Sequence, residues 1–116
     1  MIDFGLHKHD INQIINAIAK YPEINEALIF GSRAKGTFKN GSDIDIALKG
    51  TKLNFQLITS INIYLNEETT LPYTVDILNF DSINNTELTE HINRVGISIY
   101  NRKKNKKSFT TRQTSL

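Results

Sequence analysis

The spacing of apolar residues along this chain switches repeatedly between the period of a helix and that of a strand. Residues 9–20 carry isoleucines at the i, i+3, i+4 and i+7 positions of an amphipathic helix. Residues 42–48 and 73–78 alternate polar and apolar side chains as half-buried strands do, and the apolar run 27–30, closed by Gly31, is typical of a buried strand. Alternating helices and strands bury their apolar sides by packing helices on a sheet. We therefore expect an α/β (α+β) fold, a small mixed sheet with helices packed mainly on one face.

Further segments complete the predicted order of elements. Apolar residues at four-residue intervals predict a helix over 53–65. Asn85 or Thr86 can cap a helix that stops at Gly96, and 97–100 are predicted to form an edge strand. Such patterns do not settle the order or direction of the strands.

The length and the absence of cysteine restrict the class of protein. A chain of 116 residues is expected to form one domain. Because it has no cysteine, disulfides and thiolate metal sites are excluded. No apolar run approaches the length of a membrane span and no export signal is visible, so we expect a cytoplasmic protein without a membrane partner.

The basic residues are unevenly distributed. Six of the 14 lie after Tyr100 with no acid among them. We expect residues 1–100 to form the folded domain and 101–116 to be a basic, disordered tail. Such a tail could also contact nucleic acid, which would make binding strongly salt-dependent, but we do not expect nucleic-acid binding.

Two acidic residues share one face of a predicted strand. Asp43 and Asp45 are two residues apart, so their carboxylates emerge together while Ile44 and Ile46 enter the core. Adjacent anions repel each other, and a pair of hard oxygen ligands suits Mg²⁺. The alternative is that both residues simply lie on a solvated strand face.

A third acid occupies the next predicted strand. Asp76 lies between Val75 and Ile77, where an aspartate is a poor strand former. If this strand lies beside the first acidic one, Asp76 joins the cluster as a metal ligand or as a proton acceptor. Otherwise it is a solvent-facing residue of an antiparallel sheet.

The turn at Gly31-Ser32 separates the buried strand 27–30 from a predicted short helix, which Ser32 is expected to cap. Glycine permits close backbone approach, and exposed amides and the serine hydroxyl can donate to phosphate oxygens. Arg33, Lys35 and Lys39 are expected to add mobile positive charge where a triphosphate would lie. The alternative is an ordinary strand-to-helix turn.

Together these motifs resemble the polymerase-beta-like nucleotidyltransferases, whose signature is a Gly-Ser turn followed about ten residues later by Asp-x-Asp. GSRAKG at 31–36 and GSDIDIA at 41–47 look especially like the minimal nucleotidyltransferase domain of MntA-type antitoxins. The resemblance covers roughly residues 11–100 and includes PYTVD at 72–76 and HINRVG at 91–96.

The resemblance implies a metal-dependent transfer of AMP from ATP to a tyrosine of a HEPN-domain toxin. In this interpretation Asp43, Asp45 and Asp76 are catalytic and hold two Mg²⁺ ions. The residues expected to contact the nucleotide or its phosphates are Gly31, Ser32, Arg33, Lys35 and Ser42. The implied partner is the HEPN toxin, in a hetero-oligomer.

Two other functions remain open at this point. The same fold could neutralise a partner by contact, as a non-catalytic antitoxin, although the presence of all three carboxylates favours an enzyme. It could also modify a small molecule such as an antibiotic, although one short domain leaves little surface for a pocket that would bind such an acceptor.

Overall fold

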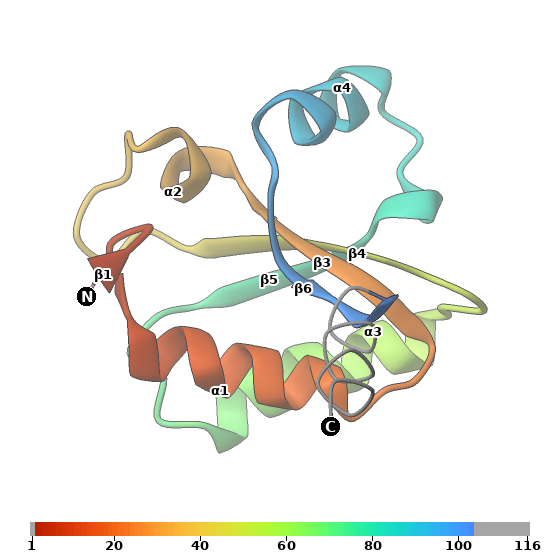
Figure 1. Cartoon of the computed structure of the whole chain (residues 1–116), viewed down its shortest axis with the longest axis horizontal. Helices are drawn as coiled ribbons and strands as arrows, with labels where there is room; N and C mark the ends of the chain where they lie inside the picture. Colours follow the sequence, from red (N-terminus) through yellow and green to blue (C-terminus); the bar gives the residue numbers. More distant parts are fainter. Residues whose placement is uncertain (1, 104–116) are drawn as a thin grey trace, which may run out of the picture.

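The computed structural model of this chain describes residues 2–103, in which a four-stranded sheet lies between two groups of helices (Figure 1). The order of strands across the sheet is β5-β4-β3-β6. β4 and β5 are parallel, whereas β3 is antiparallel to both β4 and β6. The sheet is therefore mixed, as predicted. Its strands are β3 (Ile24–Phe30), β4 (Ile44–Gly50), β5 (Val75–Asn79) and β6 (Ile97–Asn101).

The helices connect the strands in the predicted sequence. They are α1 (Lys8–Ala19), α2 (Gly31–Lys35), α3 (Phe55–Ile63) with its π-helical continuation η1 (Tyr64–Glu68), the short 3₁₀ turn η2 (Phe80–Ser82) and α4 (Thr86–Val95). Asn85 caps α4 as expected, because its side chain accepts a hydrogen bond from the Leu88 amide at 3.1 Å. A two-stranded hairpin of β1 (Ile2–Asp3) and β2 (Leu6–His7), which we did not predict, precedes α1.

Two strand boundaries differ from the sequence prediction. β3 begins three residues earlier than the apolar run 27–30, and β4 continues through Lys49-Gly50, past the predicted end of the strand at residue 48. Both differences have one cause: Ile24 and Glu26 of β3 pair with Gly50 and Lys49 of β4. Pairing between strands therefore extends them past the point where the local pattern ends.

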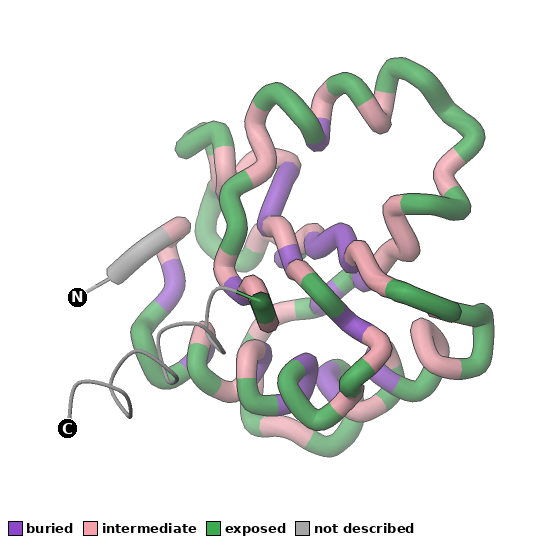
Figure 2. Tube along the Cα trace, turned by 45° about the vertical axis from the view of Figure 1, so that its right-hand side comes forward, coloured by how far each residue is buried: buried purple, intermediate pink, exposed green. Residues whose placement is uncertain are grey.

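The larger core lies between one face of the sheet and helices α1 and α3, which carry most of the helical packing (Figure 1). Alternate residues of a strand point to opposite faces, so Ile44, Ile46 and Leu48 enter this core while Ala47 faces the other way. A smaller core of Phe30, Ala47 and Ile92 joins the second face to α4. Figure 2 shows buried positions recurring along the strands.

Arg102 is anchored to the body of the domain. Its guanidinium donates hydrogen bonds to the carbonyl oxygens of Ile24, Tyr21 and Ala19, at 3.0, 2.9 and 3.3 Å. Asn101 is the last residue of β6. The folded domain therefore extends at least to Arg102, past the predicted boundary at residue 100, and the rest of the predicted tail, 104–116, lies outside the described residues.

Within residues 2–103, no helix combines the length and apolar character that crossing a membrane requires.

We predict that Ile44→Asp lowers the free energy of unfolding by at least about 3 kcal/mol, because the side chain is fully buried and a carboxylate there would have no partner. Urea unfolding followed by circular dichroism measures the change. The matched control is Ile63→Asp on α3, where the side chain is 51% exposed and the expected loss is below about 1 kcal/mol. Equal losses at the two positions would contradict the assigned burial.

Candidate active site

The parallel pairing of β4 and β5 brings two of the predicted acids together. Asp45 and Asp76 are direct partners in the register of these strands. Their neighbours Ile44, Ile46 and Val75 enter the larger core, so both carboxylates emerge on the opposite face. Adjacent strands lie about 4.8 Å apart, and the two side chains are therefore neighbours. The expectation that Asp76 lies beside the Asp-x-Asp strand is met.

The turn after β3 lies against the same carboxylate. Phe30 is the partner of Asp45 in the β3–β4 pairing, and Gly31 follows it with φ +73°. A Cβ atom added to Gly31 would lie 2.5 Å from Asp45 Oδ2. Glycine is thus required here twice, for the left-handed backbone and for the space that the carboxylate occupies. The Gly-Ser turn and the acidic pair form one site.

The three acids interact electrostatically. The pKa of Asp45 is raised, first by its burial and then by the negative charges of Asp76 and Asp43. A partly buried carboxylate with two like-charged neighbours is destabilised in its ionised form. A cation bound at this point would relieve the repulsion. Closely spaced negative charges with a raised pKa are typical of carboxylate clusters that bind metal ions.

Asp43 contributes from outside the strand. β4 begins at Ile44, so Asp43 belongs to the loop that precedes it and its side chain is exposed. The prediction placed both aspartates within a strand beginning at residue 42. The strand begins later because Ser42, immediately before Asp43, is held in the loop by hydrogen bonds with Arg33 and Lys39.

The three acids suit a metal ion that is bound partly by the protein and partly by the phosphates of a substrate. Among residues 2–103, no three or more histidine, cysteine, aspartate or glutamate side chains are grouped so as to hold a metal ion by themselves. Mg²⁺ is commonly bound by one or two carboxylates together with water and substrate phosphates, not by a complete protein cage. The oxygen donors of Asp45 and its two acidic neighbours suit that kind of site.

The short helix after the turn begins two residues earlier than predicted. Phe30 occupies the N-cap position without a side-chain hydrogen bond, and Gly31 is the first residue of α2. Ser32 therefore lies within the first turn, and the prediction that it caps the helix is wrong. Gly31, with its left-handed backbone, already makes the turn into the helix, so Ser32 lies two residues after the N-cap. The side chain of Ser32 is partly exposed.

Arg33 differs from its predicted behaviour. We expected mobile positive charge, but the residue is only 3% exposed. Its guanidinium donates to the carbonyl oxygen of Ser42 from Nε at 3.1 Å and from Nη2 at 2.8 Å, and to that of Phe4 from Nη1 at 2.9 Å. It also stacks on the rings of Phe38 and Tyr73, 5.1 and 4.7 Å from their centroids. The expectation of a mobile side chain at this position was therefore wrong.

These contacts tie Arg33 to the two segments that lead into Asp43 and Asp76. It binds the carbonyl of Ser42, immediately before Asp43, and contacts Tyr73, three residues before Asp76. The Ser42 hydroxyl accepts a hydrogen bond from the Lys39 amide at 2.8 Å and so stabilises the same loop. The sequence analysis did not predict this role. The residues that could have indicated it are the aromatic Phe38 and Tyr73, each of which precedes one of the acidic motifs.

The other predicted phosphate contacts are placed as follows. Gly31 lies against Asp45, Ser42 lies in the loop before Asp43, and Lys35 is exposed on α2. Lys39 is also exposed, in the loop between α2 and β4. Both lysine side chains are therefore free to carry charge toward a ligand, whereas Arg33 is not.

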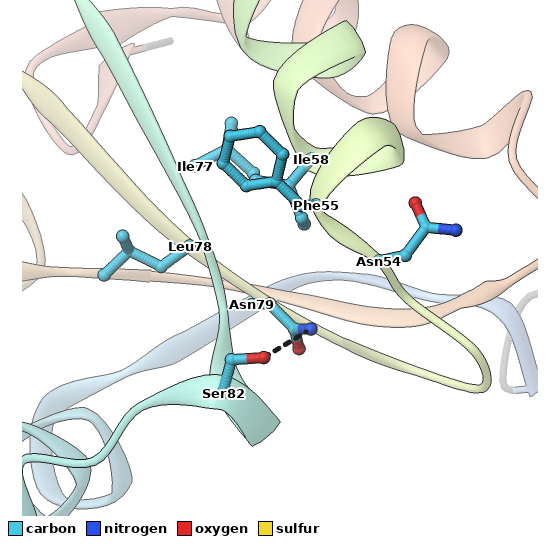
Figure 3. A pocket seen from close by; sticks show the side chains of 7 residues that line it. All are labelled: Asn54, Phe55, Ile58, Ile77, Leu78, Asn79 and Ser82. Atoms are coloured by element: carbon cyan, nitrogen blue, oxygen red, sulfur yellow. Dashed lines mark hydrogen bonds between the residues drawn. The ribbon is translucent and has the colours of Figure 1, made fainter.

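A separate apolar hollow of about 230 Å³ lies between α3 and β5 (Figure 3). Its lining includes Phe55, Ile58 and Ile77, and Asn79 donates a hydrogen bond to Ser82 at its rim. Asn79 ends β5, whereas Asp76 lies near the start of that strand. This hollow is therefore at the opposite end of β5 from the acidic site.

The family model described as polymerase beta, nucleotidyltransferase, matches residues 12–105, which include the turn and all three acids. The chain belongs to this nucleotidyltransferase family. No curated protein matches the sequence.

Solved structures share the fold of this nucleotidyltransferase. One is a chain of a toxin-antitoxin complex with AMP-PNP, 22% identical, with a TM-score of 0.66 over 95% of this chain and 86% of that one. Another belongs to the complex of a tri-AMPylated HEPN toxin from Shewanella oneidensis with its MNT antitoxin, 21% identical, with a TM-score of 0.64 and coverages of 93% and 83%. A third is a protein from Sulfolobus solfataricus assigned as a nucleotidyltransferase, 23% identical, with a TM-score of 0.52 and coverages of 83% and 81%.

We predict that Gly31→Ala destabilises the nucleotidyltransferase more than Gly36→Ala does. Both glycines have left-handed backbones, which alone costs alanine about 1–2 kcal/mol. A Cβ at Gly36 would meet no atom within 4 Å, whereas at Gly31 it would displace the Asp45 carboxylate. Urea unfolding of both variants in the presence of a chelator measures the difference, and equal losses would show that the turn does not press on Asp45.

We also predict that Asp45→Asn stabilises the fold at pH 7. Because the pKa of Asp45 is raised in the folded state, the folded chain binds more protons than the unfolded chain between the ordinary aspartate pKa of about 3.9 and the raised pKa of the folded state. Stability is therefore lost as the pH rises through this window. The gain from Asp45→Asn should be present at pH 7 and should shrink as the pH falls toward 4. The measurement is urea unfolding as a function of pH without divalent metal, with the exposed Asp81→Asn as control. A less stable Asp45→Asn variant at pH 7 would contradict the assignment.

Proposed function

We propose that this chain is a metal-dependent protein adenylyltransferase that moves AMP from ATP to a tyrosine hydroxyl of a HEPN-domain toxin, and that it acts as the antitoxin of that pair. The observation that carries the proposal is the position of one carboxylate, Asp45, which lies against Gly31 of the turn and beside its strand partner Asp76, whose charge acts on it. Membership of the nucleotidyltransferase family makes group transfer the reaction that this arrangement serves.

The choice of substrate and partner is supported by the structural relatives. One solved complex contains AMP-PNP, and another contains an MNT antitoxin together with its tri-AMPylated HEPN toxin. This chain covers more than four fifths of the matched chain in both cases. The fold of this chain therefore spans most of the matched chain in each of these complexes.

The reaction forms a bond between the acceptor oxygen and the α-phosphorus of ATP and breaks the bond from that phosphorus to the bridging oxygen, which releases pyrophosphate. The tyrosine hydroxyl loses a proton. Asp43, Asp45 and Asp76 would hold two Mg²⁺ ions, which supply charge neutralisation for the phosphates and activation of the acceptor hydroxyl. Catalysis of this kind consists mainly of positioning and electrostatic stabilisation.

Each side chain of the site has a distinct role in this proposal. The hydroxyl and amide of Ser32 donate hydrogen bonds to phosphate oxygens, and Lys35 contributes positive charge near the leaving pyrophosphate. Asp76 lies at the more exposed side of the acidic pair and receives the proton of the acceptor hydroxyl or completes the acceptor-side metal. Its exposure leaves room for a protein acceptor to approach.

We predict that Asp43→Asn and Asp45→Asn each reduce AMP transfer at least about 100-fold, because each removes a negative charge that would hold the metal ions, and the phosphates bind through those ions. The measurement is incubation of the purified chain with ATP labelled at the α-phosphate and Mg²⁺, with and without the HEPN-domain toxin proposed as its acceptor. Mass spectrometry locates the modified tyrosine.

The matched control is Asp81→Asn, since Asp81 is exposed on η2 beyond the far end of β5. This variant should transfer AMP at the rate of the unaltered chain. Transfer that continues unchanged in Asp43→Asn and Asp45→Asn would remove these two acids from the mechanism. Neutralisation of the toxin without any labelling would support an antitoxin that acts by contact.

A further inference from the structure

Two asparagines of the α3–η1 helix bind the outer edge of β5. Asn62 and Asn66 are four residues apart, so they lie on the same side of the helix. Asn62 donates to the carbonyl of Ile77 at 3.2 Å and accepts from the Ile77 amide at 3.0 Å. Asn66 does the same with Val75, at 2.8 Å in both directions. Each side-chain amide therefore makes the two hydrogen bonds that the backbone of a residue in a neighbouring strand would make.

The match depends on the dimensions of helix and strand. Four residues of a helix rise about 6 Å, and two residues of a strand extend about 6.6 Å. An asparagine pair at this helical spacing can thus reach alternate residues of a strand that runs in the opposite direction. The second amide proton of each asparagine is also used, because Asn62 donates to the Ile58 carbonyl at 3.2 Å and Asn66 to the Asn62 carbonyl at 2.8 Å.

The two bonded residues flank Asp76. β5 is an edge strand, and its other side pairs with β4, where Asp76 is the partner of Asp45. An edge strand held on one side only can shift or fray. Here the backbone immediately before and immediately after Asp76 is fixed from outside by four hydrogen bonds, while the strand pairing fixes it from inside.

We infer that Asn62 and Asn66 are positioning residues for the transfer reaction, because they hold the segment 75–77 so that the Asp76 carboxylate stays beside Asp45. This inference rests on the proposed adenylyltransferase function. The asparagines point to the edge of the strand and Asp76 points to the sheet face opposite the larger core, so they act on the carboxylate through the backbone.

The test compares Asn62→Leu and Asn66→Leu with Asn54→Ala. Asn54 caps the same helix, where its side chain accepts from the Leu57 amide at 2.8 Å, and no hydrogen bond from its side chain to β5 is present in the described part of the chain. The control therefore weakens α3 without releasing the strand. Amide hydrogen exchange should accelerate at Ile77 in Asn62→Leu and at Val75 in Asn66→Leu.

With labelled ATP and the HEPN-domain acceptor, each leucine variant should lower kcat roughly 10- to 100-fold while KM for ATP changes less than about 2-fold. Asn54→Ala should keep both values within about 2-fold. The inference is overturned if both leucine variants retain kcat although exchange at β5 has risen, or if Asn54→Ala loses as much activity as they do.

A crystal structure of Asn66→Leu separates this inference from the proposed function. If the unaltered chain transfers no AMP, the proposed function fails. The positioning role of the asparagines is then tested by the positions of the Asp45 and Asp76 carboxylates alone. Displacement of the Asp76 carboxylate away from Asp45 in the variant supports positioning, whereas an unchanged pair overturns it.

Discussion

The parallel pairing of β4 with β5 determines most of what this molecule can do, because one register sets both the core and the acidic pair. Ile44, Ile46 and Val75 pack into the larger core on one face, and Asp45 and Asp76 emerge on the other as a direct consequence. A slip of one residue would exchange the two faces. The burial of the isoleucines therefore holds two like charges together, and the repulsion between them is balanced by apolar packing on the reverse side of the same strands.

Part of this arrangement could be predicted from local patterns. The helical spacing at residues 9–20 and the alternation at 73–78 predicted α1 and β5, and the motifs indicated Asp43, Asp45 and Gly31 as candidate site residues. The direction of β5 could not be predicted, because alternation is the same in parallel and antiparallel strands. The limits of β3 and β4 were also missed, since they depend on pairing between residues that are distant in sequence.

Arg33 illustrates a different limit of sequence reasoning. A basic residue beside a glycine-serine turn has the character of a phosphate ligand, and nothing in its neighbours shows whether the side chain turns toward the ligand or inward. Only the folded chain brings Phe38 and Tyr73 around its guanidinium and offers it the Ser42 carbonyl. The same holds for Ser32, whose place within the first turn follows from the backbone of Gly31 and not from its own preference for a cap.

The anchoring of Arg102 has a consequence for how the protein is made on the ribosome. β6 completes the sheet beside β3, and Arg102 then bonds to carbonyl groups at the end of α1 and the start of β3, segments synthesised about eighty residues earlier. A nascent chain that has emerged only as far as α4 already contains the acidic pair but leaves one edge of β3 without its neighbour. Such an edge is a site for association with other chains. Rapid docking of the last strand would therefore limit the time during which newly made molecules can aggregate.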